Sequence, residues 1–174
     1  MTALPETLPS IETGQSSPSG GYIAGAEFRL PMRVYYEDTD AGGIVYHANY
    51  LKFAERARTE MLRIAGVNQT DIRNDYDLVF AVRSCAIEYL RPATLDDSLE
   101  VRSRVVRMGG ASVEILQDVW RDDLCLAKLK IRIACLRGEG PGGSGMRPGR
   151  IPEPVQVALK RFESGNMTTS VGGS

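Results

Sequence analysis

Histidine and cysteine are scarce in this sequence, and their scarcity excludes several kinds of site. His47 is the only histidine, so a metal site built from several histidines is excluded. The three cysteines show no CxxC or other ligand spacing and lie inside apolar runs, which is typical of reduced, buried side chains. We therefore predict no metal site and no disulfide framework, with Cys85, Cys125 and Cys135 buried.

A strong charge imbalance and a long apolar run are also missing. The 174 residues carry 21 Lys and Arg against 22 Asp and Glu, so no overall basic field favours nucleic acid. No stretch approaches the roughly 20 apolar residues that a membrane-spanning helix needs. Residues 1–21 contain neither a basic residue nor the apolar core of a targeting peptide. These absences predict no nucleic-acid partner, no transmembrane segment and a location in the reducing cytoplasm.

Composition divides the chain into one domain and four flanking parts. Residues 1–26 are rich in Ser, Gly, Pro and Thr without periodicity, which predicts a disordered leader. Residues 27–137 carry regular hydrophobic patterns and form the predicted domain. The glycine-rich residues 138–150 are predicted to be a flexible connector. Residues 151–163 are predicted to include a short helix that starts with proline, and residues 164–174 a disordered tail.

Strands are predicted where apolar and polar residues alternate. Alternation from Phe28 to Tyr36 indicates a first strand, and period-two patterns from residue 78 onward indicate four more, separated by turn residues. We predict that these four strands form a meander. The five strands would make one antiparallel sheet.

One long helix is predicted over residues 49–65, where apolar side chains recur at helical spacing. Asn49 is suited to cap its start and Gly66 to end it. This helix is the only predicted cover for one face of the sheet, so we predict an α+β fold in which a five-stranded antiparallel sheet wraps around one long central helix. Five strands leave an open edge, which a symmetric dimer would extend.

The stretch YEDTDAGGIVYHANYLKF, residues 36–53, joins the first strand to the helix at the end where helix N–H groups point outward. An aspartate near a helix start is commonly a cap or turn residue. Asp40, however, lies nine residues before Asn49, and the segment that follows it is apolar and glycine-rich. A lone histidine in this position is commonly structural, but His47 and Asp40 would be able to flank one substrate carbonyl. Glu37 and Asp38 are interpreted as solvated turn charges.

The residues between Asp40 and His47 are predicted to contact substrate. Two glycines allow positive φ and a close approach to the backbone, and the apolar residues after them are suited to lining a pocket. The predicted contact residues are Gly42, Gly43, Ile44 and Val45.

Two metal-binding patterns resemble the same stretch. DTDAGG resembles the start of a calcium loop, but the twelfth position counted from Asp38 is Asn49 rather than glutamate. The DxD pattern also resembles aspartate-dependent phosphotransferases that use Mg²⁺, a chemistry that usually sits on a doubly wound parallel sheet. A Mg²⁺-dependent phosphatase therefore remains an alternative at this point.

Basic side chains recur at alternate positions of two predicted strands. A solvated sheet face is the favoured interpretation. A landing surface for the phosphates of a nucleotide-bearing substrate, or for an acidic carrier protein, is the alternative. The residues are Arg102, Arg104, Arg107, Lys128, Lys130 and Arg132.

Three segments carry a family resemblance. RVYYEDTDAGGIVYHANYLKFAERARTEMLR closely resembles the hotdog-fold acyl-CoA thioesterases of the 4-hydroxybenzoyl-CoA thioesterase family, especially the branch encoded beside the Tol-Pal envelope system. IEYLRPATLDDSLEV and RMGGASVEI are similar to the same branch. The resemblance extends from Phe28 to Leu136, and more weakly to Lys160.

The resemblance implies a hotdog fold, hydrolysis of acyl thioesters of CoA or a carrier protein without metal or cofactor, and assembly as a dimer or tetramer. It implies that Asp40 is the catalytic carboxylate, that Tyr36 and His47 have catalytic roles, and that a backbone N–H near His47 donates to the oxyanion. Peripheral association with the inner membrane is consistent with that branch. A hotdog dehydratase and a non-catalytic acyl-CoA or acyl-carrier binding module are the alternatives.

Overall fold

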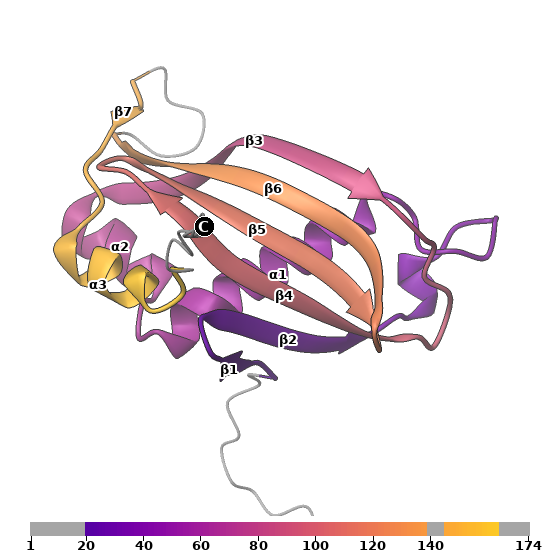
Figure 1. Ribbon diagram of the computed structural model, residues 1–174. Helices are drawn as coiled ribbons and strands as arrows, with labels where there is room; N and C mark the ends of the chain where they lie inside the picture. Colours follow the sequence, from indigo (N-terminus) through magenta and orange to yellow (C-terminus); the bar gives the residue numbers. More distant parts are fainter. Residues whose placement is uncertain (1–19, 139–144, 164–174) are drawn as a thin grey trace, which may run out of the picture.

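The computed structural model describes residues 20–138 and 145–163, and Figure 1 shows a curved sheet around a long helix. The elements in chain order are β1 (Tyr22–Ala24), β2 (Glu27–Arg33), the 3-10 turn η1 (Tyr36–Asp38), α1 (Asn49–Ile64), α2 (Gln69–Tyr76), β3 (Leu78–Tyr89), β4 (Ser98–Met108), β5 (Ser112–Arg121), β6 (Leu124–Arg137), β7 (Arg147–Pro148) and α3 (Glu153–Lys160).

The described strands form one sheet in the order β1-β2-β4-β5-β6-β3, with β7 paired to β6. Every pairing between these strands is antiparallel. The five long strands, β2 to β6, are the predicted ones, and the short strands β1 and β7 extend the sheet. The predicted α+β hotdog class is confirmed.

The predicted meander is correct only for β4, β5 and β6. β3 pairs with β6, from Leu78 opposite Arg137 to Tyr89 opposite Ala127, and it does not pair with β4. Residues 90–97 carry the chain from the end of β3 to β4, which pairs with β2. The sequence marks this connection as a turn but contains no signal for the distance that it spans. β3 consequently forms one edge of the sheet.

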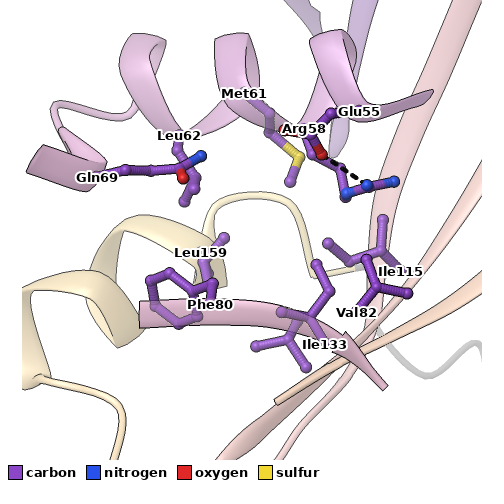
Figure 2. Close-up of a pocket in the computed structure, with 11 residues that line it drawn as sticks. Glu55, Arg58, Met61, Leu62, Gln69, Phe80, Val82, Ile115, Ile133 and Leu159 are labelled. Carbon is purple, nitrogen blue, oxygen red and sulfur yellow. Dashed lines mark hydrogen bonds and ion pairs between the residues drawn. The ribbon is translucent and has the colours of Figure 1, made fainter. Parts of the chain in front are cut away.

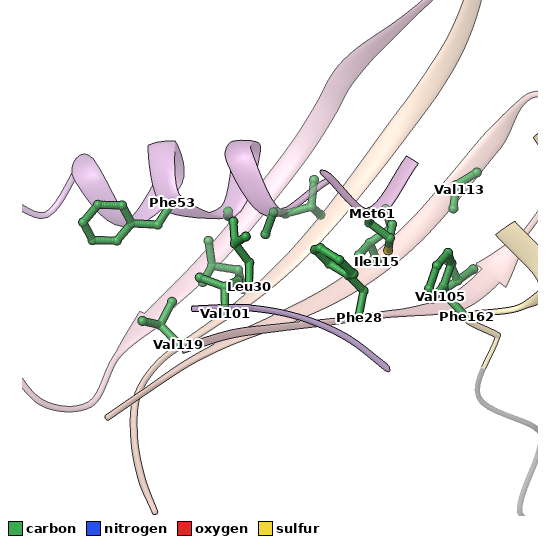
Figure 3. Close-up of a cluster of buried hydrophobic side chains, with 14 of the residues drawn as sticks. Phe28, Leu30, Phe53, Met61, Val101, Val105, Val113, Ile115, Val119 and Phe162 are labelled. Atoms are coloured by element: carbon green, nitrogen blue, oxygen red, sulfur yellow. The ribbon is translucent and has the colours of Figure 1, made fainter. Parts of the chain in front are cut away.

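The core lies between α1 and the concave side of the sheet (Figure 3). Helical spacing places Phe53, Ala57 and Met61 on one face of α1, and each is at most 1% exposed. Burial of a large apolar side chain stabilises the fold by about 1.5–3 kcal/mol. The strands contribute alternating side chains to this core, among them Phe28, Leu30, Val101, Val105, Ile115 and Val119.

The two ends of α1 are held differently. Gly66 has a φ of +80°, and the N–H of Val67 donates to the carbonyl of Leu62 at 2.9 Å, which confirms the predicted helix end. Asn49 is the first helical residue rather than a cap, and its buried Nδ2 donates to the carbonyl of Asp38 at 2.8 Å. The predicted Asn49 cap is therefore wrong, because this side chain binds the preceding turn.

A polar link joins α1 to the sheet through the core. Arg58 is 8% exposed, and its guanidinium donates to Gln117 Oε1 at 2.9 Å. The guanidinium also pairs with Glu55 at 2.7 Å (Figure 2). The Gln117 amide donates to the carbonyl of Ala54 at 3.0 Å and to Ser103 Oγ at 2.8 Å. Hydrogen-bonded in this way, the buried polar groups fix the position of the helix on the sheet. A mostly apolar cavity of about 70 Å³ lies beside Arg58.

The cysteines only partly follow their predicted burial. All three are free; Cys135 is buried, Cys125 is intermediate and Cys85 is exposed. The prediction is wrong for Cys85 because β3 is an edge strand whose outer half is open.

Most of the flanking predictions lie outside the described residues, which exclude 1–19, 139–144 and 164–174. Within the segment assigned to a leader, Tyr22–Ala24 form β1 and pair with β2. α3 lies within residues 151–163 and has Pro154 in its first turn. Among the helices of the described part, none combines the length and apolarity needed to cross a bilayer.

Candidate active site

Residues 39–45 form a tight hairpin that carries Asp40. Thr39 pairs with Val45, the Asp40 N–H donates to the carbonyl of Ile44 at 3.0 Å, and the Gly43 N–H donates to the carbonyl of Asp40 at 3.0 Å. Gly43 has a φ of +74°, in the left-handed region that favours glycine. The backbone of the hairpin therefore explains the residue type at position 43.

The Asp40 carboxylate is exposed, and its hydrogen-bonding capacity is only partly used. Oδ1 accepts from the N–H of Gly42 at 2.8 Å, which orients the carboxylate. Over residues 20–138 and 145–163, no hydrogen bond or ion pair to Oδ2 is recorded. One carboxylate oxygen is thus held in place while the other is free for a substrate.

Asp38 is buried beneath the hairpin and is 3% exposed. Its Oδ2 accepts from the N–H of Tyr35 at 2.9 Å, and its carbonyl accepts from the N–H of Tyr46 at 2.8 Å and from Asn49. The prediction that Asp38 is a solvated turn charge is wrong. Asp38 joins the end of the first strand to the start of α1, whereas Glu37 is exposed as expected.

Residues 90–97, which connect β3 to β4, hold the hairpin in place through hydrogen bonds. The N–H of Val45 donates to the carbonyl of Ala93 at 2.8 Å, and Thr94 donates from its N–H to Asp97 Oδ2 at 2.8 Å. Arg121 pairs with the same carboxylate at 2.6 Å. Burial alone would raise the pKa of Asp97, but the hydrogen bonds from Thr94 and Arg121 outweigh it and lower that pKa.

An open groove of about 380 Å³ brings several predicted residues together. Asp40 and His47 both line it, as do the predicted contact residues Ile44 and Val45. Gly42 and Gly43 shape the adjacent hairpin and are absent from the lining. The other lining residues are Tyr50, Tyr89, Leu90, Arg91 and Pro92.

In the described part of the chain, the two backbone amides that directly precede α1, those of His47 and Ala48, have no recorded acceptor. The N–H groups of Val45, Tyr46 and Asn49 all donate to backbone carbonyls. For His47 and Ala48, no acceptor of the N–H is recorded in the part of the chain that the structure describes. Two free N–H groups beside a helix N-terminus are suited to bind a developing oxyanion.

Two tyrosines that sequence reasoning missed build one wall of the groove. The ring of Tyr89 lies 5.5 Å from that of Tyr50, and its hydroxyl donates to the carbonyl of His47 at 2.9 Å. Burial raises the pKa of Tyr50, and partial burial of the half-exposed Tyr89 raises the pKa of its phenol in the same direction. Tyr50 accepts a hydrogen bond from the N–H of Ala93 at 3.1 Å. The only sequence signal for Tyr89 is its place in the segment IEYLRPATLDDSLEV.

Tyr36 is not brought to the groove. It lies in η1 and is 81% exposed, so the strand that alternation predicted to extend to Tyr36 ends before it. β2 ends at Arg33, and the chain turns before it reaches Tyr36.

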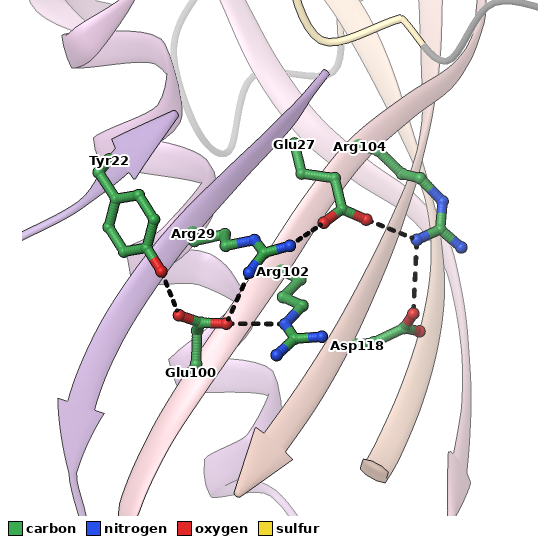
Figure 4. A network of polar contacts seen from close by, with 7 residues as sticks. All are labelled: Tyr22, Glu27, Arg29, Glu100, Arg102, Arg104 and Asp118. Carbon is green, nitrogen blue, oxygen red and sulfur yellow. Dashed lines mark hydrogen bonds and ion pairs between the residues drawn. The ribbon is translucent and has the colours of Figure 1, made fainter. Parts of the chain in front are cut away.

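The outer face of the sheet neutralises much of its own charge (Figure 4). Glu27 pairs with Arg29 at 3.2 Å and with Arg104 at 3.3 Å, and Glu100 pairs with Arg102 at 2.7 Å. Such pairing favours the interpretation of the basic rows as a solvated sheet face. Arg107, Lys128 and Arg132 have no ion pair recorded within the described ranges.

Two of the alternative activities fit this architecture poorly. The phosphatase alternative needs a doubly wound parallel sheet, whereas the strands of this sheet pair antiparallel. The dehydratase alternative pairs a histidine with a carboxylate on the helix, whereas the carboxylate that lines the groove with His47 is Asp40 from the hairpin.

Comparison with known proteins identifies close relatives. Residues 42–127 match the thioesterase superfamily. An acyl-CoA thioesterase, YbgC, from Haemophilus influenzae is 43% identical over 136 residues, which cover 78% of this chain and 96% of the relative. An acyl-CoA thioester hydrolase, YbgC, from Escherichia coli is 38% identical over 135 residues, with coverages of 77% and 96%.

Solved structures share the fold. A probable thioesterase from Bartonella henselae has a TM-score of 0.65 at 37% identity and covers 71% of this chain and 98% of its own. A mutant 4-hydroxybenzoyl-CoA thioesterase, solved with 4-hydroxybenzoyl-CoA, has a TM-score of 0.69 at 15% identity, with coverages of 77% and 99%. At that identity the second likeness concerns the fold alone.

Proposed function

Because this chain belongs to the thioesterase superfamily, we infer that it is an acyl-CoA thioesterase, a hydrolase that cleaves an acyl thioester to a free acid and a thiol. The relatives that carry this activity in their names match nearly their whole length to the chain. The hairpin that carries Asp40 lies at the edge of the family match, which starts at residue 42.

One observation carries our proposal for the site: a partly free carboxylate and the start of α1, with its two free amides, meet at one groove. Asp40 belongs to the groove lining, and so does His47, which carries one of those amides. The thioester carbonyl would lie between them. Asp40 would act on the carbonyl carbon from one side, while the amides bind the oxyanion from the other.

Two routes use this arrangement. In the first, Asp40 attacks the carbonyl carbon, the C–S bond breaks to release the thiolate, and water hydrolyses the resulting mixed anhydride. In the second, Asp40 takes a proton from water, which attacks the carbonyl directly. The acid and the thiol are the products of both routes.

Single-turnover hydrolysis in H₂¹⁸O distinguishes the two routes. Attack by Asp40 leaves label in its carboxylate after hydrolysis of the anhydride at the aspartyl carbon, and mass analysis of the Asp40 peptide detects it. A labelled peptide together with an unlabelled product acid would support the anhydride route, and an unlabelled peptide with a labelled product acid would contradict an anhydride that water opens at the aspartyl carbon. The product acid formed in unlabelled water is the control.

The other predicted site residues have more limited proposed roles. His47 contributes its backbone N–H, and its imidazole lines the groove where it is able to donate to the same oxyanion. Gly42 orients Asp40 through its N–H, and Gly43 permits the hairpin. Ile44 and Val45 contact the acyl thioester. Tyr36 would act only on a part of the substrate, or of a second copy, that reaches the outside of η1.

We propose a homodimer through the edge strand β3. Val82, Cys85 and Tyr89 are exposed along this strand, and its free edge has backbone groups available for a second copy. Because β3 ends at Tyr89 in the groove, a paired strand would run beside the active site. A tetramer made from two such dimers is compatible with this arrangement.

Light scattering with size-exclusion chromatography tests the dimer. Val82→Lys places a charge on the exposed part of β3 and should convert the dimer to a monomer, and Val157→Lys on the exposed side of α3 is the matched control. A monomeric wild-type protein, or a Val82→Lys variant that stays dimeric, would contradict this interface.

A thiol-release assay over aromatic, short-chain and long-chain acyl-CoA esters tests the activity itself, and acyl-carrier protein thioesters extend the panel. Turnover of at least one thioester that disappears in Asp40→Ala is the expected result. Absence of turnover across the panel, with binding retained, would favour a non-catalytic binding module.

A cytoplasmic location, with peripheral association at the inner membrane beside the Tol-Pal system, completes the proposal. The three free cysteines are compatible with a reducing compartment. Fractionation of cells that express the tagged protein, with and without a high-salt wash, tests this location.

A further inference from the structure

Tyr89 connects the edge strand β3 to the residues just before α1 through a side-chain hydrogen bond. Its hydroxyl donates to the carbonyl of His47 at 2.9 Å. Its ring lies between two others, 5.5 Å from Tyr50 and 6.4 Å from His47, with interplanar angles of 76° and 90°. Packing of the ring therefore positions the Tyr89 hydroxyl, and its hydrogen bond fixes the direction of the His47 carbonyl.

The carbonyl that Tyr89 holds lies between the two free amides. The His47 N–H precedes it in the same residue, and the Ala48 N–H belongs to the same planar peptide group. In a trans peptide the C=O and N–H point in opposite directions, so fixing the carbonyl fixes the direction of the Ala48 N–H. It also limits rotation about ψ of His47.

We propose that Tyr89 is a positioning residue for the oxyanion site, whose hydroxyl holds the His47 carbonyl and thereby orients the free amides of His47 and Ala48. This inference rests on the proposed thioesterase function. It assigns Tyr89 no contact with the reacting atoms. The hydrogen bond also polarises the His47–Ala48 peptide, which strengthens the Ala48 N–H as a donor.

The phenol is suited to this task because it stays a donor. Burial raises the pKa of Tyr89, and the nearby Cys85 acts in the same direction. The neutral hydroxyl is therefore present throughout the neutral pH range. A phenylalanine at this position keeps the ring between His47 and Tyr50 and removes only the donor.

Steady-state kinetics of Tyr89→Phe is the first test. Loss of one whole oxyanion donor typically costs about 10²- to 10³-fold in kcat, and loss of its positioning should cost less, about 10-fold, with KM within about 2-fold of wild type. Tyr46→Phe is the matched control, because the Tyr46 ring packs against His47, with ring centroids 4.4 Å apart and an interplanar angle of 56°, while no hydrogen bond of its hydroxyl is recorded in the described part. Wild-type kcat in Tyr89→Phe, or an equal loss in both variants, would overturn the proposal.

Isotope-edited infrared spectroscopy measures the polarisation of the bound thioester carbonyl, which would not change if Tyr89 had a purely structural role. The fastest substrate of the acyl-CoA panel, labelled with ¹³C at its carbonyl, is bound to the slow variant Asp40→Asn. Binding should lower the carbonyl stretching frequency because the amides polarise the C=O. The lowering should be smaller in Asp40→Asn/Tyr89→Phe, and an equal frequency in the two variants would overturn the proposal.

Different results would contradict the thioesterase function and the role of Tyr89. If the wild-type protein shows no hydrolysis that depends on Asp40, the proposed function fails. If that hydrolysis is present and Tyr89→Phe matches wild type in kcat, the function stands and the role of Tyr89 is wrong.

Discussion

The groove beside α1 and the outer face of the sheet are both polar, but they use their polar groups in opposite ways. On the outer face, Glu27 and Glu100 each meet two arginines, and Tyr22 donates to Glu100 at 2.7 Å (Figure 4). In the groove, Asp40 keeps one oxygen without a partner among the described residues, and the neighbouring amides of His47 and Ala48 have no acceptor recorded there. Hydrogen-bonding capacity that the fold leaves unused is available to a substrate.

The same contrast separates two aspartates that are two positions apart. Asp38 is buried, and its carboxylate and carbonyl both accept hydrogen bonds from the surrounding backbone and side chains. Asp40 is exposed, and the one hydrogen bond that its carboxylate makes to the described residues, from the N–H of Gly42, orients it. Asp38 is therefore expected to affect mainly stability and Asp40 mainly activity.

Asp40→Ala should have the largest effect. Removal of the proposed nucleophile or base should lower kcat by about 10³-fold, within the range of about 10²- to 10⁴-fold known for general acid–base groups. The melting temperature should stay close to that of wild type, because the lost bond is confined to an exposed turn. Thiol release and thermal denaturation measure the two quantities. Glu37→Ala is the matched control, and wild-type kcat in Asp40→Ala would refute the assignment.

Asp38→Ala should show the reverse pattern. It leaves the N–H of Tyr35 without its partner, at a cost of about 1–3 kcal/mol in the free energy of unfolding. Chemical denaturation measures this cost. Asp38→Asn keeps an acceptor oxygen and should lose less. An Asp38→Ala variant with wild-type stability and no turnover would contradict the expectation that Asp38 affects mainly stability and Asp40 mainly activity.

Glu100→Gln should change little, because partly exposed ion pairs of this kind contribute about 0.2–1 kcal/mol each and glutamine keeps an acceptor oxygen. The free energy of unfolding should fall by less than about 1 kcal/mol, and kcat should be unchanged. Hydrogen bonds and ion pairs hold the pKa of Glu100 below its usual value even though burial opposes them. A large loss of activity would show that the outer face takes part in catalysis.

Asp97→Asn should give the smallest effect, a slightly lower melting temperature at neutral pH that approaches that of wild type as the pH becomes acid. The pKa of Asp97 is lowered in the folded state, so its contribution to stability is present above the unfolded pKa of about 3.9 and is lost as pH falls through the folded pKa. The melting temperature of wild type should therefore fall more steeply below about pH 4 than that of Asp97→Asn. Parallel pH profiles would show that Asp97 does not contribute through this linkage.

Local patterns predicted much of the site. Asp40, His47, Ile44 and Val45 all line the groove, because one short turn carries them and its chemistry is continuous in the sequence. Tyr89 comes from a strand 42 positions away from His47, and no local pattern predicts that meeting. The prediction of a solvated Asp38 is wrong for a similar reason, because its burial depends on contacts with Asn49 and on the packing of the hairpin, which no local pattern indicates.

By itself, the sequence determined the long helix, the five main strands, the α+β class and the position of the turn that carries Asp40. These features follow from periodicity and turn chemistry, which act over a few neighbouring residues. Only the tertiary structure decided that β3 lies at the edge beside β6, that Tyr89 reaches the His47 carbonyl and that Asp38 is buried while Asp40 stays open. Those outcomes depend on contacts between distant segments, and the free energies of such contacts are set by packing in three dimensions.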